Sequence, residues 1–212
     1  WYSDDIKGCR STVIPNAINP IFIRPQYKGK KRKVIASVGR LNSQKNFELL
    51  INAFSKIASE FPDYILTIYG KGDKEQELKN LVSHLNIRDR VFFPGNIQNI
   101  AEEMEKNTLF VLSSDFEGMP NALMEAMALG LPCISTDCPC GGPRYLIQNG
   151  VNGLLVPVGD VDKLAEAMRT ILSNANAAEN IGREAVKIIE NLAPNKIYNQ
   201  WEKFIVSIIE GR

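Results

Sequence analysis

Short apolar segments alternate with amphipathic segments along most of this chain, and this alternation constrains the fold more than any other feature. Residues 33–39 form an apolar, partly β-branched run that ends at a glycine, which is typical of a buried parallel strand. From Phe47 to Ala58, apolar residues recur at three- and four-residue spacing, which indicates an amphipathic helix. Residues 64–69 and 76–85 repeat the order of strand and helix. The sequence therefore begins with two strand–helix units.

The same order continues through the middle of the chain. We expect further strands at 91–93, 109–112, 132–135 and 153–156, with helices at 100–105 and 122–129. Such alternation predicts an α/β fold: a Rossmann-like three-layer domain with a parallel six-stranded sheet and right-handed crossovers. Ligands of these sheets bind at the carboxyl ends of the strands. The loops after Val38, Tyr69, Phe93 and Leu112 are therefore the places to look for chemistry.

Composition limits the class of protein. The chain has 212 residues, of which 44% are hydrophobic and 23% are charged, as expected of one globular domain with a substantial core. The formal net charge of +1 gives no general attraction to nucleic acid. No apolar run approaches the roughly 18 residues of a membrane span, and the first residues lack the layout of a signal peptide. We expect a cytoplasmic protein that does not bind nucleic acid.

The two ends of the chain differ from its centre. Residues 1–31 have the character of a tail leading into a domain and do not start with Met, so we expect an excised piece whose domain proper covers residues 32–193. Residues 194–212 predict a C-terminal amphipathic helix with a stripe that includes Ile197, Trp201 and Ile205. This stripe packs either on the sheet or on a domain outside this chain.

The cysteines do not suggest a disulfide framework or a metal centre. Cys9, Cys133, Cys138 and Cys140 are few and unevenly spaced, which favours reduced thiols. Residues 138–140 resemble half of a metal site, but no second pair exists and the only histidine, His84, falls in a predicted helix. We therefore expect no metal.

Two cations follow the first predicted strand, in residues 39–46 (GRLNSQKN). Arg40 supplies a rigid fork of donors and Lys45 a flexible point charge, a combination that suits a diphosphate. Taken alone, the pair is explained more simply as solvated surface cations.

A more specific pattern follows the fourth predicted strand, in residues 115–126 (DFEGMPNALMEA). Gly118 allows a ligand to approach the backbone closely, and Pro120 and Asn121 open a helix whose free N–H groups favour phosphate oxygens. Glu117 and Glu125 flank this helix start. No general requirement of the fold accounts for that pair of glutamates.

These two segments resemble the group 1 family of retaining glycosyltransferases with the two-domain GT-B fold. The family's hallmark is a pair of glutamates separated by seven residues after a strand, together with the Gly-Arg-Leu…Lys-Asn stretch upstream. The similarity extends through residues 70–72, 91–95 and 149–157, and residues 12–16 resemble the family's interdomain linker. The resemblance implies the C-terminal, donor-binding half of such an enzyme. Residues 1–31 would be a linker remnant, and the N-terminal acceptor domain would be absent.

The resemblance also implies roles for individual residues. Arg40 and Lys45 would hold the donor diphosphate and neutralise the charge that builds up as it leaves, Glu117 would contact the transferred sugar, and Glu125 would accept hydrogen bonds from the ribose. No cofactor or metal would be needed. The remaining donor-binding positions would be Gly39, Gly70, Gly72, Phe93, Pro94, Gly95, Asn96, Gly118, Met119, Pro120, Asn121 and Leu123, of which those around Phe93 to Asn96 would bracket the base.

The implied reaction moves a hexose or N-acetylhexosamine from a nucleotide-diphosphate sugar to a glycan or lipid-linked acceptor in polysaccharide biosynthesis, with retention of configuration. Residues 142–144 (GPR) resemble relatives that often use UDP-linked sugars, which favours a UDP-sugar donor. Tyr145 stands where many relatives carry a glutamate, so the sugar itself stays open.

Other classes of protein fit these residues less well. A dinucleotide-binding oxidoreductase would have its glycine fingerprint after the first strand, and a glycoside hydrolase would not place its carboxylates around a phosphate-binding helix start. A non-catalytic nucleotide-sugar-binding module fits the same residues. The basic run at residues 28–33 (KGKKRK) predicts a solvated loop, and the alternative is a peripheral contact with anionic lipids at the inner face of a membrane.

Overall fold

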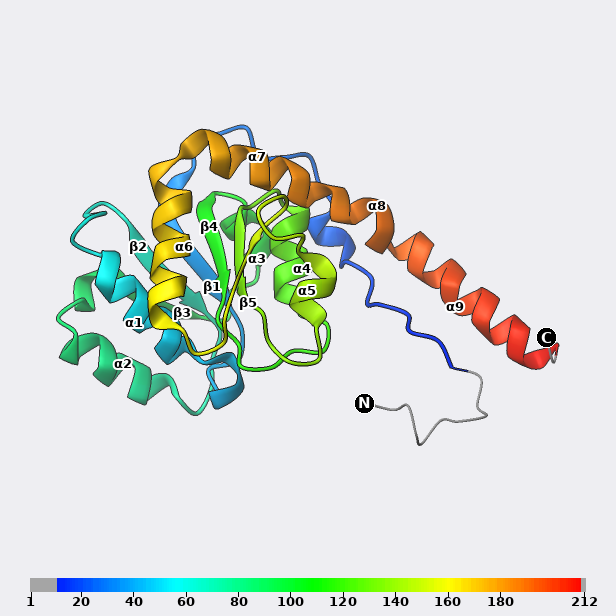
Figure 1. The fold of residues 1–212 in the computed structure, drawn as a ribbon, viewed down its shortest axis with the longest axis horizontal. Coiled ribbons are helices and arrows are strands. Elements are labelled where there is room, and N and C mark those ends of the chain that lie inside the picture. Colours follow the sequence, from blue (N-terminus) through cyan, green and yellow to red (C-terminus); the bar gives the residue numbers. More distant parts are fainter. Residues whose placement is uncertain (1–10, 211–212) are drawn as a thin grey trace.

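A computed structural model describes residues 11–210 and contains a parallel sheet of six strands in the order β3-β2-β1-β4-β5-β6. The predicted α/β fold and the predicted number of strands are therefore confirmed (Figure 1). The strands are β1 (Arg32–Val38), β2 (Ile65–Tyr69), β3 (Val91–Gly95), β4 (Asn107–Leu112), β5 (Cys133–Thr136) and β6 (Leu154–Val156). The α-helices are α1 (Phe47–Ile57), α2 (Glu75–His84), α3 (Ile100–Met104), α4 (Asn121–Ala128), α5 (Gly142–Leu146), α6 (Val161–Ser173), α7 (Ala175–Ala185), α8 (Ile189–Leu192) and α9 (Pro194–Ile209). Short 3-10 turns are η1 (Pro20–Phe22), η2 (Ser43–Lys45), η3 (Arg88–Arg90) and η4 (Val186–Ile188).

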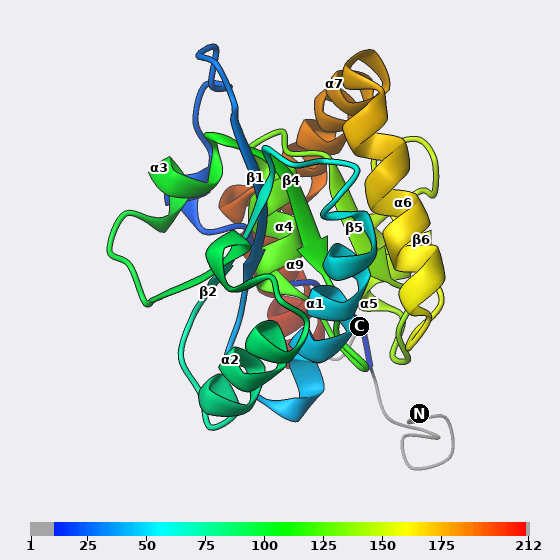
Figure 2. The same ribbon diagram turned by 90° about the vertical axis from the view of Figure 1, so that its left-hand side faces the viewer.

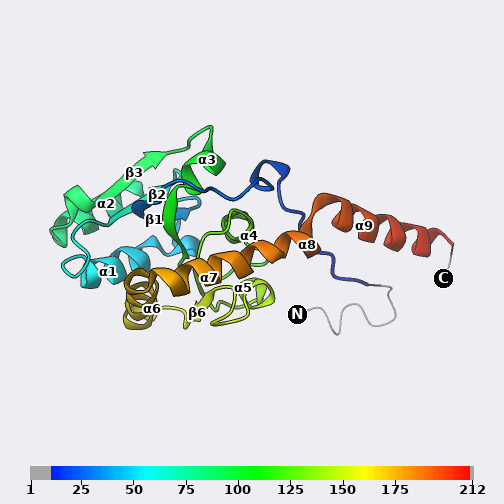
Figure 3. The ribbon, with the colours of Figure 1, turned by 90° about the horizontal axis from the view of Figure 1, so that it is seen from above.

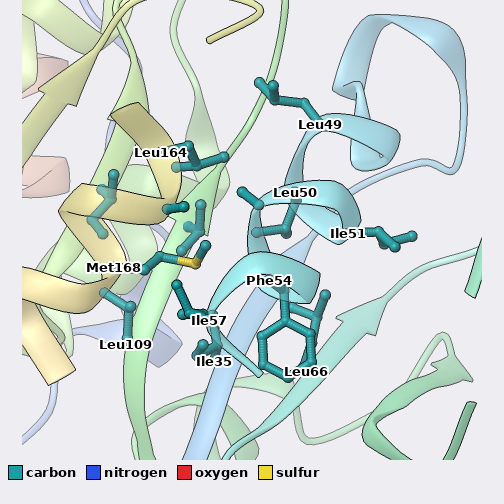
Figure 4. Packing of buried hydrophobic residues seen from close by; sticks show 14 of the residues in the cluster. Ile35, Leu49, Leu50, Ile51, Phe54, Ile57, Leu66, Leu109, Leu164 and Met168 are labelled. Atoms are coloured by element: carbon teal, nitrogen blue, oxygen red, sulfur yellow. The ribbon is translucent and has the colours of Figure 1, made fainter. Parts of the chain in front are cut away.

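Helices lie on both faces of the sheet (Figure 2), and each face carries a hydrophobic cluster. On one face, Leu50 and Phe54 of α1 and Met168 of α6 converge on β1, β2 and β4 (Figure 4). On the other face, α3 and α4 pack with Phe110 of β4. Continuous burial on both faces explains why the strands are apolar runs and do not alternate between apolar and polar residues.

Strand order places the reversal point of the sheet between β1 and β4. Ala36 pairs with Phe110 there, and the two neighbouring strands run parallel. The helix that follows β1 belongs to one face and the helix that follows β4 belongs to the other. Open α/β sheets bind ligands at such a reversal point, so the loops after these two strands are where a site is expected.

The segment before β1 packs on the domain. Ile18 and Phe22 are almost fully buried in the same cluster as α4. The N–H of Ile18 also donates to the carbonyl of Leu192, at 2.9 Å. The described part of the predicted linker is thus attached both to the sheet domain and to the C-terminal helices. Residues 1–10, which include Cys9, lie outside the described residues.

The basic run at residues 28–33 lies at the amino ends of the strands, and its last two residues, Arg32 and Lys33, begin β1. Lys33 pairs with Asp63 at 2.6 Å and Arg32 pairs with Glu103 at 2.8 Å. Lys31 donates to the carbonyl of Glu105, and burial lowers the pKa of its ammonium group. These contacts engage half of the run with protein groups.

The C-terminal helix α9 extends away from the body of the domain (Figure 3). Ile197, near its start, is buried, but apolar side chains further along are exposed, including Trp201 at 48% and Ile209 at 78%. Within residues 11–210, no helix combines the length and the apolar character needed to cross a membrane.

Candidate functional site

The loops that follow β1, β2 and β3 touch one another at the carboxyl edge of the sheet. Gly70 has φ +136°, and a side-chain carbon at this position would lie 1.9 Å from the carbonyl oxygen of Gly39. The N–H of Gly70 donates to the carbonyl of Gly95 at 3.0 Å. Only glycine allows this approach, so the three loops form one continuous wall.

A cavity of about 520 Å³ opens beside this wall. It is lined by Val38, Gly39, Arg40, Tyr69, Gly70, Lys71, Gly95, Asn96, Ile97 and Ile100. Arg40 is exposed and makes no ion pair with any residue between 11 and 210. The cavity thus combines an apolar floor with two cations, Arg40 and Lys71, at its rim.

Lys45 and Glu117 join the loop after β1 to the loop after β4. Lys45 Nζ lies 2.5 Å from Glu117 Oε1, and the same oxygen accepts a hydrogen bond of 2.7 Å from Ser114 Oγ. Glu117 is only 6% exposed. Burial, together with the charge of Glu117, raises the pKa of the nearby Cys138 thiol to about 11. The two predicted catalytic residues are therefore partners in a largely buried ion pair.

Hydrogen bonds join the loop that carries Lys45 to the loop that carries Glu117. Ser113 Oγ donates to the carbonyl of Lys45 at 2.8 Å, and Asn46 Nδ2 donates to Asp115 Oδ1 at 2.7 Å. Gln44 adds two bonds, accepting from the N–H of Asp115 at 2.9 Å and donating to the carbonyl of Phe116 at 3.0 Å. The ion pair therefore rests on a rigid connection between the two loops.

The start of α4 is open on the same side. No side chain among the described residues caps it, and Pro120 precedes its first residue, Asn121. Gly118 has free space around the position of a side chain, whereas a side-chain carbon on Gly142 would lie 1.9 Å from the Gly118 carbonyl oxygen. Free N–H groups and the helix dipole make this start an anion-binding element.

Glu125 lies one turn into α4 and is half-buried. Its carboxylate makes no hydrogen bond or ion pair within residues 11–210. Burial alone raises the pKa of its carboxyl group to about 7. A half-buried carboxylate without a protein partner can accept hydrogen bonds from the hydroxyl groups of a ligand.

The side chains of some predicted residues do not point into the cavity or toward the Lys45–Glu117 pair. Phe93 packs against the cluster that contains α1 and α2, because side chains in a strand alternate and Phe93 shares the face of Val91. Leu123 is fully buried in the opposite cluster, and Met119 packs against it. Pro94 is exposed on β3. Gly72 packs closely against the backbone carbonyl of Leu41.

Several residues at the site were not predicted. Lys71, Tyr69 and Ile100 line the cavity, and Ser114 holds Glu117. Asn16 Nδ2 donates to Asn121 Oδ1 at 2.9 Å, so the segment before β1 reaches the start of α4. Lys71 could have been predicted from the sequence, because it lies two residues after β2 and the loops at that edge were expected to carry chemistry.

The described cysteines are free thiols: Cys133 and Cys138 are buried and Cys140 is exposed. Within residues 11–210, no three His, Cys, Asp or Glu side chains are arranged to hold a metal ion.

The fold and the candidate site together define a class: a Rossmann-like domain with cations and an uncapped helix start at the carboxyl edge of its sheet. Comparison with known proteins makes this class specific. Residues 20–188 match the family "Glycosyl transferases group 1". The chain belongs to this family.

Individual relatives agree with the family match. The chain is 34% identical to an exopolysaccharide phosphotransferase of Streptomyces coelicolor, covering 96% of this chain and 21% of that protein. It is 33% identical to the lipopolysaccharide 1,6-galactosyltransferase of Escherichia coli, covering 97% of this chain and 58% of the relative. The chain therefore spans well under two thirds of either relative.

A solved structure shows the same fold. A mutant of S. aureus TarM, in complex with fondaparinux, alpha-GlcNAc-glycerol and UDP, superposes with a TM-score of 0.84 at 22% identity, over 91% of this chain and 39% of that one. The six-stranded parallel domain is thus the architecture found in GT-B glycosyltransferases.

Proposed function

We propose that this chain is the donor-binding half of a retaining GT-B glycosyltransferase that moves a hexose or N-acetylhexosamine from a UDP-sugar to a glycan or lipid-linked acceptor in polysaccharide biosynthesis. The observation that carries the proposal is the Lys45–Glu117 pair, placed between the β1 and β4 loops beside the open start of α4. The UDP in the TarM complex supports the choice of nucleotide.

The donor fits the site in two parts. The base and ribose would occupy the cavity beside Gly39 and Gly95, with the ribose hydroxyls donating to Glu125. The diphosphate would lie between Arg40, Lys45 and the start of α4. Each of these groups is positively charged or presents N–H donors, which suits a ligand with two negative charges.

Catalysis would depend on electrostatics. As the sugar leaves, negative charge builds up on the diphosphate, and the preorganised donors of Arg40, Lys45 and α4 stabilise it. Loss of one such contact in other enzymes raises the barrier by about 3 kcal/mol. The transferred sugar would lie against Glu117. These roles require no cofactor and no metal.

A binding titration tests the proposal. The chain is titrated with UDP, GDP and ADP, and then with UDP-glucose, UDP-galactose and UDP-N-acetylglucosamine. We expect UDP to bind best among the nucleotides. Tighter binding of GDP would contradict the choice of nucleotide, and no binding of any of them would contradict the donor-site assignment.

The proposal also places a second domain against this chain. Helix α9 and the segment before η1 project from the same side of the domain (Figure 3), and both carry exposed apolar side chains, such as Trp201 at 48% and Val13 at 91%. We propose that an N-terminal acceptor domain of the longer protein covers them. Hydrogen exchange of α9 in the longer protein should then be slower than in the 212-residue chain, and equal exchange would contradict this contact.

A non-catalytic nucleotide-sugar-binding module is the second candidate, because binding alone uses the same residues. A transfer assay on the longer protein separates the two functions. Transfer of labelled sugar to a glycan or lipid-linked acceptor supports the enzyme, while donor binding without transfer to any acceptor supports the module.

A further inference from the structure

Ser114 is the last buried side chain before the loop that carries Glu117. It follows β4 and is fully buried, and its hydroxyl donates to Glu117 Oε1 at 2.7 Å. Its own carbonyl accepts a hydrogen bond of 2.5 Å from Oγ1 of Thr136, the last residue of the neighbouring strand β5. Ser114 is therefore held from the sheet side and in turn holds the carboxylate.

The two donors to Glu117 differ in mobility. Lys45 reaches Oε1 with a long flexible side chain, whereas Ser114 has a single rotatable Cα–Cβ bond and lies in the buried segment just after β4. Under the proposed function, a bound diphosphate competes with Glu117 for the ammonium group of Lys45. A carboxylate that kept only Lys45 as a partner would then be free to rotate.

We propose that Ser114 is the positioning residue for Glu117: its hydroxyl fixes Oε1 and leaves Oε2 as the oxygen that accepts a hydrogen bond from the transferred sugar. This inference rests on the proposed function. It assigns Ser114 no contact with the donor itself. The effect of Ser114 should therefore be confined to the sugar part of the donor and should require Glu117.

The test measures affinity for UDP and for the UDP-sugar that binds most tightly, by calorimetry on the 212-residue chain. Ser114→Ala should leave UDP affinity within about twofold of the wild type while lowering the ratio of UDP-sugar to UDP affinity about fivefold. Ser37→Ala is the matched control, because Ser37 is equally buried and its hydroxyl bonds only to the carbonyl of Val111. This control should change neither affinity.

A double-mutant comparison distinguishes positioning from a general loss of structure. In a Glu117→Ala background, adding Ser114→Ala should cause no further loss of sugar affinity. If Ser114→Ala does not fold, Ser114→Cys keeps the volume with a weaker donor and should lower the same ratio.

Three results have separate meanings. An unchanged ratio in Ser114→Ala, or an equal loss for UDP and UDP-sugar, overturns the role of Ser114 while the proposed function stands. A further loss in the Glu117→Ala background overturns the claim that Ser114 acts through Glu117. A wild-type chain that binds no nucleotide overturns the proposed function, and the role of Ser114 with it.

Discussion

The ammonium group of Lys45 lies 2.5 Å from a carboxylate oxygen of Glu117, although 72 residues separate them in the sequence. Their side chains are 19% and 8% exposed, so the pair is largely shielded from water. In the absence of ligand, the cation proposed for the diphosphate is neutralised by the carboxylate proposed for the sugar. Donor binding therefore has to redistribute the partners of Lys45.

Lys45→Met should destabilise the chain, because it leaves the buried carboxylate of Glu117 without its cation. Removing one partner of a buried pair typically costs about 3 kcal/mol or more, and a domain of this size shifts its melting temperature by roughly 2 to 4 °C per kcal/mol. We expect a decrease of about 6 to 12 °C by calorimetry. Lys45→Met combined with Glu117→Gln should recover part of it, and no recovery would show that the two residues are not coupled.

Glu125→Gln should stabilise the chain at alkaline pH. Burial raises the pKa of Glu125 to about 7, so the folded state holds this proton more tightly than the unfolded state, whose pKa is close to 4.5. The contribution of Glu125 to the free energy of unfolding is therefore highest below pH 4.5, and it decreases as the pH rises to about 7. Because the side chain is partly exposed, we expect a gain on the order of 1 kcal/mol at pH 8.

This gain should shrink towards pH 5, where wild-type Glu125 is protonated and resembles glutamine. Denaturant titrations at pH 5 and pH 8 measure both values. A pH-independent difference between variant and wild type would contradict the raised pKa.

The same substitution should have the opposite effect on ligand binding. If the ribose hydroxyls donate to an ionised Glu125, affinity for a UDP-sugar should increase from pH 6 to pH 8 in the wild type, because ionisation provides a charge-assisted acceptor. Glu125→Gln should bind several-fold more weakly at pH 8 and show little pH dependence. If the variant is more stable and binds the UDP-sugar as tightly as the wild type, Glu125 does not belong to the donor site.

The strands could be predicted as short apolar runs, as in β1, and the long helices from the three- and four-residue spacing of their apolar residues, as in α1. The short helix α5 was missed, since five residues that begin with Gly142 and Pro143 show no helical period. Its start depends on Cys140 and Gly141, which have φ values of 72° and 75°.

The candidate site could be predicted only in part, because a motif gives the order of residues and not the direction of their side chains. The resemblance placed Phe93 and Leu123 among the donor contacts, yet strand alternation and helix phase direct both side chains into the hydrophobic clusters. The bond from Ser114 to Glu117 had no sequence signal, since a serine at a strand end has many possible partners.

Two glycine substitutions should separate binding from folding. Gly118→Ala meets no atom within 4 Å, so its melting temperature should change little, but donor affinity should fall if a phosphate lies against this backbone. Gly142→Ala would place a carbon 1.9 Å from the Gly118 carbonyl oxygen and should lower both stability and affinity. Unchanged donor affinity in Gly118→Ala would show that the phosphate does not lie against this loop.

The last prediction concerns activity: this chain should bind a nucleotide diphosphate and yet transfer no sugar on its own. The cavity, the ion pair and the start of α4 all belong to one domain, and the chain spans 21% and 58% of two of its relatives. Under the proposed function, the acceptor is held by another domain of the longer protein. Orienting two reactants can account for roughly 7 to 11 kcal/mol of a barrier, so a complete donor site without a positioned acceptor should leave transfer undetectable. Slow hydrolysis of the donor can persist, because water needs no binding site. The measurement compares this chain and the longer protein with a labelled UDP-sugar and the same glycan and lipid-linked acceptors. Comparable transfer by this chain alone would refute the two-domain arrangement and would require an acceptor site within residues 1–212.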